Sequence, residues 1–291
     1  MWCVAQGLYK VYSKIGNFYI VFCLNSWEMV TIRKFDEVYS YITTKRFLGR
    51  TLFSSNVYAT GDVVIDSGMN RDISYFPELA APSSLVLTHA HIDHAGNARA
   101  FAKTFGAPVY ADQRAIATLS SHQRPSLLIR CKVGSAPPVD ARPLPGPIET
   151  TEGLLEPLHT PGHCADHTCY YLPSRRHLFS GDLVLHATTT WVSSEVRIWE
   201  AIESLKRISK LRIDTLFPGH GEPFTDPHET IVYKHARLEA LGRHVLDLSE
   251  DGMRPEEIRD DVLGREGPIA YLSRGRFSKL NLIKSFLDGS P

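Results

Sequence analysis

The sequence predicts an α/β fold in which two β-sheets pack face to face and helices cover both outer faces, an αββα four-layer sandwich. Strand-like runs alternate with helical segments in the first half of the chain, and the same alternation returns in the second half. After Asp226 the pattern changes to helices. Apolar residues make up 43% of the 291 residues, which is enough for a core of ordinary size.

The first half is expected to consist mainly of strands separated by turns that contain glycine. These strands cover residues 8–16, 17–24, 37–43, 56–60, 62–68, 84–90 and 108–111. One helix is expected over 95–105, ended by Gly106, and another over 112–122 with Asp112 as its N-cap. A proline-rich loop is expected at 135–147.

The second half repeats this order and then adds a helical end. Strands are expected at residues 154–160, 167–173, 177–183 and 214–220. The helix that follows the third of these strands has Glu203 and Arg207 paired on one face, and the apolar positions of its other face are Ile198, Ile202, Leu205 and Ile208. Further helices are expected over 229–248, 255–262 and 279–287.

These elements divide the chain into three expected parts. A catalytic domain covers residues 32–228, and a small helical C-terminal domain covers 229–291. Residues 1–31 form an N-terminal extension without a chemistry-bearing motif. Either this extension adds a pair of strands or the native product begins at Met29, and an intact mass that includes Met1 would exclude the later start.

Charge and cysteine content argue against several classes of protein. The 32 basic and 32 acidic residues cancel, so the whole protein has no electrostatic attraction to nucleic acid or to an anionic membrane. The five cysteines form no CxxC pair, which favours a reducing compartment over a disulfide framework. No apolar run approaches the roughly 18 residues of a membrane helix. We therefore expect a cytoplasmic protein without a membrane partner.

The segment THAHIDHAGN carries the chemistry, because it holds His89, His91, Asp93 and His94 in the pattern H-x-H-x-D-H. An extended backbone directs His89 and His91 to the same side, whereas the adjacent Asp93 and His94 point to different sides. One short loop can therefore serve two metal ions. Burying these side chains without such a partner would cost several kcal/mol.

Three further candidate ligands each lie on a short turn flanked by glycine: His163 in TPGHCADH, Asp182 in FSGDLV and His220 in FPGHGEP. Together with the cluster they make too many ligands for one tetrahedral ion and about the right number for two ions that share a carboxylate. We expect two divalent ions. Zinc is favoured, and iron and manganese accept the same nitrogen and oxygen ligands.

With these motifs in place, the chain closely resembles the metallo-β-lactamase superfamily from about residue 32 to residue 225. The family's first motif is matched by Asp66, its second by the histidine cluster, and the remaining three by the three turns just described. The resemblance implies an αββα sandwich with a dimetal site at one sheet edge. It also implies a first ion on His89, His91 and His163, a second ion on Asp93, His94 and His220, and Asp182 as the bridge.

Details of the motifs favour one branch of this family. Asp182 is a bridging aspartate that true β-lactamases of the family usually lack, and His91 stands where flavodiiron members carry glutamate. The sequence GHGEP replaces the GHEYT of glyoxalase II, whose ligand set is otherwise similar. TPGHCADHT, FPGHGEP and a Tyr233, His235, Arg237 pattern resemble the lactamase-like protein 2 group. That group has a small helical C-terminal domain, and some members cut single-stranded RNA.

The resemblance implies hydrolysis by a hydroxide that the two ions share, with the pKa of the parent water lowered to near ~7. Asp93 is the expected catalytic residue, because it can orient the nucleophile as well as bind an ion. Asp66 is expected behind the ligands, where it would fix their orientation. Cys164 and Cys169 are expected to be buried apolar residues, not nucleophiles.

Further residues are candidates for substrate contact. His167 and His186 lie near the motifs and could line the pocket, although His167 could equally pack behind a ligand. Tyr233 and Arg237 share one face of the expected helix over 229–248 and could form a substrate-facing pair.

The favoured function is hydrolysis of a small ester, thioester or lactone, so a small molecule is the expected partner. The alternative is an endoribonuclease that uses the same site, with RNA as its partner, and it rests on the basic residues Arg274, Arg276, Lys279 and Lys284. A third possibility is a sulfur dioxygenase with one iron on His89, His163 and Asp182. The sequence predicts no oligomeric state.

Overall fold

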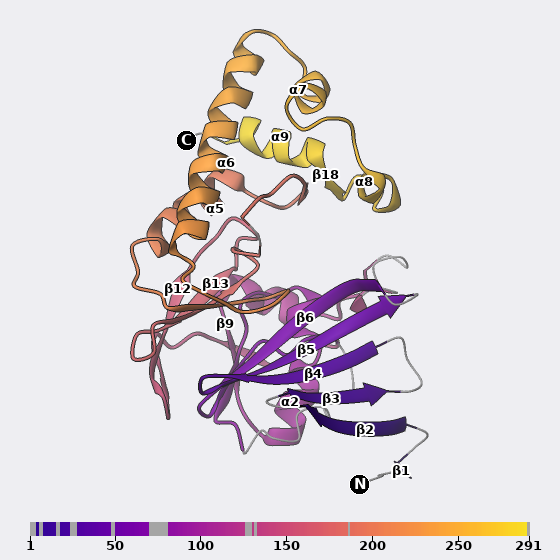
Figure 1. Ribbon diagram of the computed structural model, residues 1–291, viewed down its shortest axis with the longest axis vertical. Coiled ribbons are helices and arrows are strands. Elements are labelled where there is room, and N and C mark those ends of the chain that lie inside the picture. Colours follow the sequence, from indigo (N-terminus) through magenta and orange to yellow (C-terminus); the bar gives the residue numbers. More distant parts are fainter. Residues whose placement is uncertain are drawn as a thin grey trace.

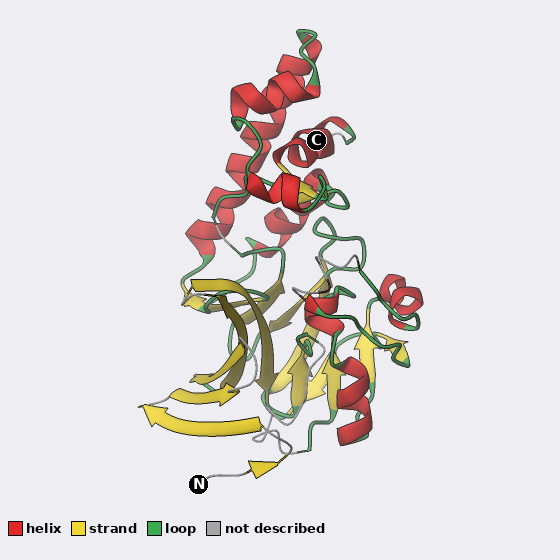
Figure 2. Cartoon of the chain, turned by 90° about the vertical axis from the view of Figure 1, so that its right-hand side faces the viewer, coloured by secondary structure: helices red, strands yellow, loops and turns green. Residues whose placement is uncertain are grey.

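The computed structural model describes residues 4–5, 8–15, 18–23, 28–47, 50–69, 81–125, 130, 133–185 and 187–289. These residues form a ten-stranded sheet, a six-stranded sheet and a two-stranded pair (Figure 1). Helices flank the strands on one side and gather at one end of the molecule (Figure 2). The predicted α/β fold class is confirmed.

The first sheet contains the strands β1 to β10 in sequence order. Neighbours are antiparallel from β1 to β7 and parallel from β7 to β10. The expected N-terminal strands belong to it, since β3 pairs with β4. The bounds are β1 Val4–Ala5, β2 Leu8–Ile15, β3 Phe18–Cys23, β4 Glu28–Phe35, β5 Val38–Phe47, β6 Arg50–Thr60, β7 Val63–Ile65, β8 Ser84–Val86, β9 Val109–Ala111 and β10 Ala141–Pro143.

The second sheet has the order β11-β12-β13-β14-β16-β17, and only the β14–β16 pair in it is parallel. The two-stranded pair joins β15 to β18, which come from distant parts of the sequence. The bounds are β11 Ile148–Thr150, β12 Gly153–His159, β13 Thr168–Leu172, β14 His177–Gly181, β15 Val192–Ser193, β16 Thr215–Pro218, β17 Phe224–Thr225 and β18 Phe277–Ser278.

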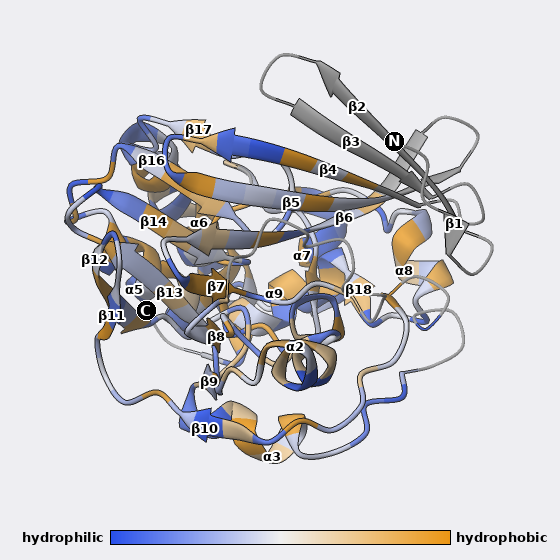
Figure 3. Ribbon diagram, turned by 90° about the horizontal axis from the view of Figure 1, so that it is seen from below, coloured by the Kyte–Doolittle hydropathy of each residue, from blue (hydrophilic) through white to orange (hydrophobic). Residues whose placement is uncertain are grey.

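The alternation of side chains along each strand produces the layers, and hydrophobic and hydrophilic residues alternate along strands of the first sheet (Figure 3). Val63 and Ile65 of β7 face the second sheet and pack in one core with Tyr170 and Phe179. Val64 between them faces the opposite way, into a core shared with Phe101 of α2. One face of the first sheet therefore packs on the second sheet and the other packs on helices.

The outer face of the second sheet is covered by α5 and by C-terminal helices, which share one apolar core. Ile231, Leu238 and Phe286 from this C-terminal part pack in the same core as Leu178 of β14. The helical bounds are α1 Ile92–Ala95, α2 Ala98–Phe105, η2 Gln113–Ala115, α3 Ile116–Leu119, α5 Ile198–Ile208, α6 His228–Glu250, α7 Pro255–Val262, α8 Pro268–Leu272 and α9 Lys279–Leu287. None of the helices in the described part of the chain has the length and apolarity that crossing a membrane requires.

Several local expectations need correction. The helix expected over 95–105 begins only at Ala98, because α1 ends at Ala95 and a turn intervenes. Asp112 caps its helix as expected, but that helix is a short η2–α3 run that ends at Leu119. The expected proline-rich loop contains β10, which pairs with β9.

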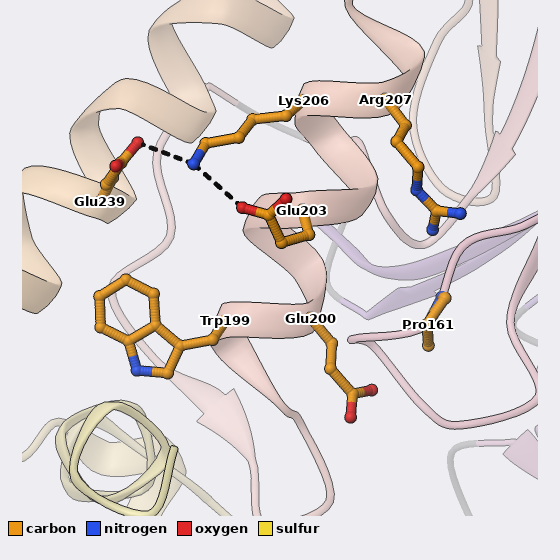
Figure 4. A pocket seen from close by; sticks show the side chains of 7 residues that line it. All are labelled: Pro161, Trp199, Glu200, Glu203, Lys206, Arg207 and Glu239. Carbon is orange, nitrogen blue, oxygen red and sulfur yellow. Dashed lines mark hydrogen bonds and ion pairs between the residues drawn. The ribbon is translucent and has the colours of Figure 1, made fainter. Parts of the chain in front are cut away.

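The expected Glu203–Arg207 pair on α5 is also wrong. Lys206 lies between Glu203 and Glu239, at 3.0 and 3.3 Å, in the pocket shown in Figure 4. Arg207 instead donates to the carbonyl oxygen of His159 at 2.9 Å. Two carboxylates from adjacent helices attract the lysine more strongly than one carboxylate on the same helix attracts the arginine.

Candidate metal centre

The seven residues that the sequence marks as metal ligands lie together in the structure. The first three bring imidazole nitrogens into contact: His91 Nδ1 is 2.9 Å from His89 Nε2 and 3.1 Å from His163 Nε2. His89 is fully buried, whereas the side chains of His91 and His163 are 29% and 21% exposed to solvent. This group is therefore open to solvent on one side.

The remaining residues meet around Asp182. Its Oδ1 lies 3.4 Å from His94 Nε2, and its Oδ2 lies 3.4 Å from His220 Nε2 and 3.5 Å from His163 Nε2. Asp93 Oδ2 lies 3.5 Å from His220 Nε2. The carboxylate of Asp182 thus faces both groups of histidines at once.

Parallel strands bring two of these residues to one sheet edge. Asp182 follows β14 and His220 follows β16, so the carboxyl ends of the two neighbouring strands place them side by side. Between them, Gly219 leaves no room for a side chain, since a Cβ there would lie 2.5 Å from Asp182 Oδ1 and 2.7 Å from His94 Cε1. The glycine of FPGHGEP is therefore needed for the close approach of these residues.

Asp66 fixes the loop that carries the histidine cluster. Its carboxylate accepts hydrogen bonds from the backbone N–H of Thr88 at 2.7 Å and from the Thr88 hydroxyl at 2.8 Å. The same carboxylate lies 2.8 Å from His94 Nδ1. When His94 binds an ion its ring is neutral, so that Nδ1 donates to Asp66 and the lone pair of Nε2 is free for the ion.

His167 lies beneath the site and does not line a pocket wall. It is fully buried, and its Nε2 accepts a hydrogen bond from the backbone N–H of Asp182 at 3.1 Å. Its Nδ1 donates to the carbonyl oxygen of Thr160 at 3.1 Å. Burial lowers the pKa of His167 to about 3, so the ring is neutral and supports the turn that carries Asp182.

Charges in the site compensate one another. Burial disfavours the charged form of Asp182, but His220, His94 and His163 outweigh it and hold the pKa of this carboxyl well below its ordinary value. In return, the carboxylates of Asp182 and Asp66 overcome burial and raise the pKa of His94 well above its ordinary value. Burial lowers the pKa of His163 to about 4. The site therefore combines ionised carboxylates with imidazoles that they attract.

This donor set fits divalent metal ions. His94 Nε2 and Asp182 Oδ1 are buried, and neither has a hydrogen-bond partner among the described residues. Such atoms are costly unless something else satisfies them. Imidazole nitrogens and carboxylate oxygens are ligands that zinc, iron and manganese accept. Ligand atoms that lie within 4.8 Å of one another form three groups: His89, His91, His163 and Cys164; His89, His94 and Asp182; Asp93, His94 and His220.

Sequence reasoning missed three residues at this site. Glu195 Oε1 lies 3.3 Å from His91 Nε2, and nothing in its sequence position indicated this contact. Asp166 accepts a hydrogen bond from the backbone N–H of Ala90 at 2.8 Å, and its place inside TPGHCADH could have identified it. Cys164 and Cys169 are buried free thiols as expected, yet Cys164 is among the groups that could hold an ion.

Two candidates lie elsewhere and one is not described. Tyr233 and Arg237 are exposed on α6, and within the described part of the chain neither makes a hydrogen bond or ion pair with the seven residues. The structure therefore gives no support to a substrate-facing pair at these positions. His186 lies outside the described residues.

Curated relatives resemble this chain over much of its length. A protein named atrochrysone carboxyl ACP thioesterase from Aspergillus fumigatus is 28% identical over 225 residues, which cover 73% of this chain and 65% of the relative. The β-lactamase-like protein 2 homolog of Drosophila melanogaster is 28% identical over 198 residues, which cover 63% of this chain and 64% of the relative. The chain thus spans slightly under two thirds of the length of these relatives.

Solved structures share the fold. A metallo-β-lactamase family protein, TTHA1429 from Thermus thermophilus, is 20% identical with a TM-score of 0.63, over 87% of this chain and 93% of that protein. TTHA1623, solved in a di-iron-bound form, is 26% identical with a TM-score of 0.51, over 61% of this chain and 93% of that protein. The sequence model that describes the metallo-beta-lactamase superfamily matches residues 50–220, which is more than half of the chain. The chain belongs to this superfamily of metal-dependent hydrolases.

Proposed function

We propose that this protein is a dinuclear metal-dependent hydrolase that cleaves a thioester or a related ester of a small molecule. One observation supports the dinuclear site above all: the single carboxylate of Asp182 faces histidines of both ligand groups at 3.4 to 3.5 Å. A carboxylate in this position can hold two ions at the spacing of a dinuclear hydrolase.

The two ions would be held as the family resemblance implies. His89, His91 and His163 would bind the first ion, and Asp93, His94 and His220 would bind the second. Two such ions would supply a nucleophilic hydroxide at neutral pH and would polarise the substrate's carbonyl oxygen. Zinc fits the nitrogen-rich set, and the di-iron form of TTHA1623 supports iron as the other candidate.

The protein's own groups orient the reacting atoms. Asp93 keeps its carboxylate 3.5 Å from His220 Nε2, while its backbone carbonyl accepts a hydrogen bond from the Ser55 hydroxyl. The side chain of Asp93 is 17% exposed, so it can both bind an ion and accept a proton from the nucleophile. Buried His89 and His94 exclude water from the inner side of the site.

A thioester substrate is supported by two observations. Three curated relatives carry the name thioesterase, one each from Aspergillus fumigatus, Emericella nidulans and Aspergillus terreus. In addition, Trp191 is 47% exposed, lies four residues before Glu195 and contacts the ring of Phe277 at 5.9 Å. An exposed aromatic side chain at this place in the chain can contact the apolar acyl part of such a substrate.

The test is a substrate panel with metal-stripped and metal-loaded protein. We expect zinc or iron to restore hydrolysis of acyl thioesters, with weaker turnover of oxygen esters and lactones and none of β-lactams. The panel includes single-stranded RNA. Of the four C-terminal basic residues, Arg276 pairs with Glu195 and Lys279 donates to the carbonyl oxygen of Leu263, whereas Arg274 and Lys284 are exposed. Metal-loaded protein that cleaves RNA but no thioester would overturn the proposal.

Replacing Asp93 with alanine should reduce turnover by roughly two orders of magnitude or more, because the variant loses both a ligand and a proton acceptor. Metal content should fall below that of the wild type. Elemental analysis and the kcat for the best thioester of the panel provide the measurement. A variant with full activity and only one ion would exclude the dinuclear mechanism.

Replacing Trp191 with alanine should raise KM for long acyl thioesters by about tenfold, with little change for an acetyl thioester, because only the long chain reaches the ring. The matched control is Leu154→Ala, which removes an apolar side chain that is 44% exposed on β12. Equal effects of both substitutions, or equal effects on long and short acyl chains, would contradict this assignment.

A further inference from the structure

His91 is held between two kinds of partner. Its Nδ1 faces His89 and His163 at 2.9 and 3.1 Å, whereas its Nε2 lies 3.3 Å from Glu195 Oε1. We propose that Glu195 is a positioning residue for the metal ligand His91, and that the C-terminal segment from Arg276 to Ser285 holds Glu195 in place. This inference rests on the proposed metal centre.

The contact selects one tautomer of the ring. Only one nitrogen of a neutral imidazole carries a proton, and a carboxylate beside Nε2 favours the proton there. The lone pair of Nδ1 is then directed at the other two histidines. An imidazole with such an acceptor behind it keeps both its orientation and its basicity as a ligand. Without Glu195, the ring of His91 could rotate or carry its proton on Nδ1, and either change would weaken the ligand set.

The segment that carries Glu195 is bound on both sides by the C-terminal part of the chain. Before Glu195, β15 pairs with β18, and the backbone N–H of Ser194 donates to the carbonyl oxygen of Arg276 at 3.1 Å. After Glu195, Ser285 of α9 donates its hydroxyl to the carbonyl oxygen of Val196 at 2.8 Å and accepts from the N–H of Ile198 at 2.9 Å. These contacts fix the backbone of residue 195 relative to the metal loop.

The side chain of Glu195 is also directed by its neighbours. Arg276 Nη2 lies 3.8 Å from the same Oε1 that contacts His91, and the Ser193 hydroxyl donates to this oxygen at 3.4 Å. Arg276 is itself 44% exposed, so its pair with Glu195 alone would add little stability. The arrangement provides orientation, because Ser193 of β15 and Arg276, which directly precedes β18, aim one carboxylate at one metal ligand. The helical C-terminal part thus takes part in the site from outside the histidine cluster.

The test is a zinc titration of metal-stripped protein in competition with a chromophoric chelator. Glu195→Ala should weaken the tighter site by about 10- to 100-fold, as expected for loss of a group that orients a ligand. Glu195→Gln should recover most of the affinity, because its amide oxygen still accepts from Nε2–H. Glu203→Ala is the matched control, since it also removes an exposed carboxylate paired with a cation, at 3.0 Å from Lys206. The control should bind zinc as the wild type does.

Two further measurements separate positioning from general stability. Long-range 15N–1H spectra of the metal-stripped protein should show His91 with its proton on Nε2 in the wild type and as a mixture of tautomers in Glu195→Ala. If the alanine variant folds poorly, Glu195→Met replaces it, because methionine keeps the length of glutamine without the acceptor. The Glu195→Gln variant should then bind zinc at least about 10-fold more tightly than the Glu195→Met variant.

The role of the C-terminal segment is tested by a double-mutant cycle. Arg276→Met should weaken zinc binding by about two- to fivefold in the wild type and have no further effect when Glu195 is alanine. Additive effects would overturn the link through Arg276. If wild-type protein binds no zinc or iron, the proposed function fails. If the wild type binds zinc and Glu195→Ala binds it equally well, only the present inference fails.

Discussion

Replacing Asp182 with asparagine is expected to lower kcat/KM by roughly two to three orders of magnitude and to weaken the binding of both ions. The substitution preserves the size of the side chain but removes a negative charge that lies 3.4 to 3.5 Å from His94, His163 and His220. The amide group of asparagine would also direct N–H donors at one of these histidines. An imidazole nitrogen that binds an ion cannot accept a hydrogen bond from them. Both ligand groups lose their common partner at once.

Elemental analysis, zinc competition and thioester kinetics measure this effect. The control is Asp214→Asn, which removes a carboxylate of similar size that pairs with Arg176 at 2.6 Å and is 48% exposed. The control should retain two ions and full activity. If the Asp182→Asn variant keeps two tightly bound ions and a near-normal kcat/KM, the carboxylate of Asp182 does not bridge the two ions. Loss of ions from only one group would instead identify a terminal ligand.

Much of the site could be predicted because its ligands are local. Each candidate lies within a short turn at a strand end, so the sequence motif places the side chain without reference to distant residues. The parallel pairing of β14 with β16 then brings Asp182 beside His220, as the strand-then-ligand pattern indicated. The fold class followed from the same alternation of strands and helices. The ends of α7 and α9 also agree with the sequence, because Pro255 and Ser278 mark clear helix starts.

The contacts that were missed depend on long-range packing. Glu195 reaches His91 only because β15 pairs with β18, across more than eighty positions of the chain, and two-residue strands leave no periodic signal. His167 was a candidate either for the pocket wall or for a packed position behind a ligand, and the structure places it in the second, under Asp182. The roles of Glu195 and His167 behind the ligands thus depend on His91 and Asp182, two partners that the local sequence does not reveal. The helical face that carries Tyr233 and Arg237 is exposed because Ile231 and Leu238 occupy the packed face of α6.

Replacing Asp66 with alanine is expected to destabilise the protein strongly while leaving all seven candidate ligands in place. Asp66 is 2% exposed and accepts hydrogen bonds from the N–H and the hydroxyl of Thr88, as well as facing His94 Nδ1 at 2.8 Å. Alanine would leave these buried donors without an acceptor. Each unsatisfied group costs about 1 to 3 kcal/mol, so the free energy of unfolding should fall by about 3 to 5 kcal/mol.

The backbone of Asp66 adds a smaller contribution that a control can subtract. Its φ of 60° lies in the left-handed region, where alanine is less favourable than aspartate or asparagine by about 1 kcal/mol. Asp226 has a φ of 51° and is exposed, so Asp226→Ala measures the backbone contribution alone. Urea denaturation of metal-stripped protein should therefore show a small loss for Asp226→Ala and a much larger one for Asp66→Ala.

Replacing Asp66 with asparagine removes the negative charge of the side chain and keeps its shape. Its amide oxygen can still accept from the N–H of Thr88, and it tolerates the left-handed backbone, so most of the stability should remain. Its amide nitrogen, however, would face His94 Nδ1, which now donates to a carboxylate. The ring would have to move its proton to Nε2, the nitrogen that faces Asp182 at 3.4 Å, and would lose its lone pair for an ion. Asp66→Asn should therefore weaken zinc binding by about 10- to 100-fold while changing the unfolding free energy by less than half as much as alanine does. Equal losses of stability and of metal affinity in both variants would show that Asp66 only holds the loop and has no influence on the proton of His94.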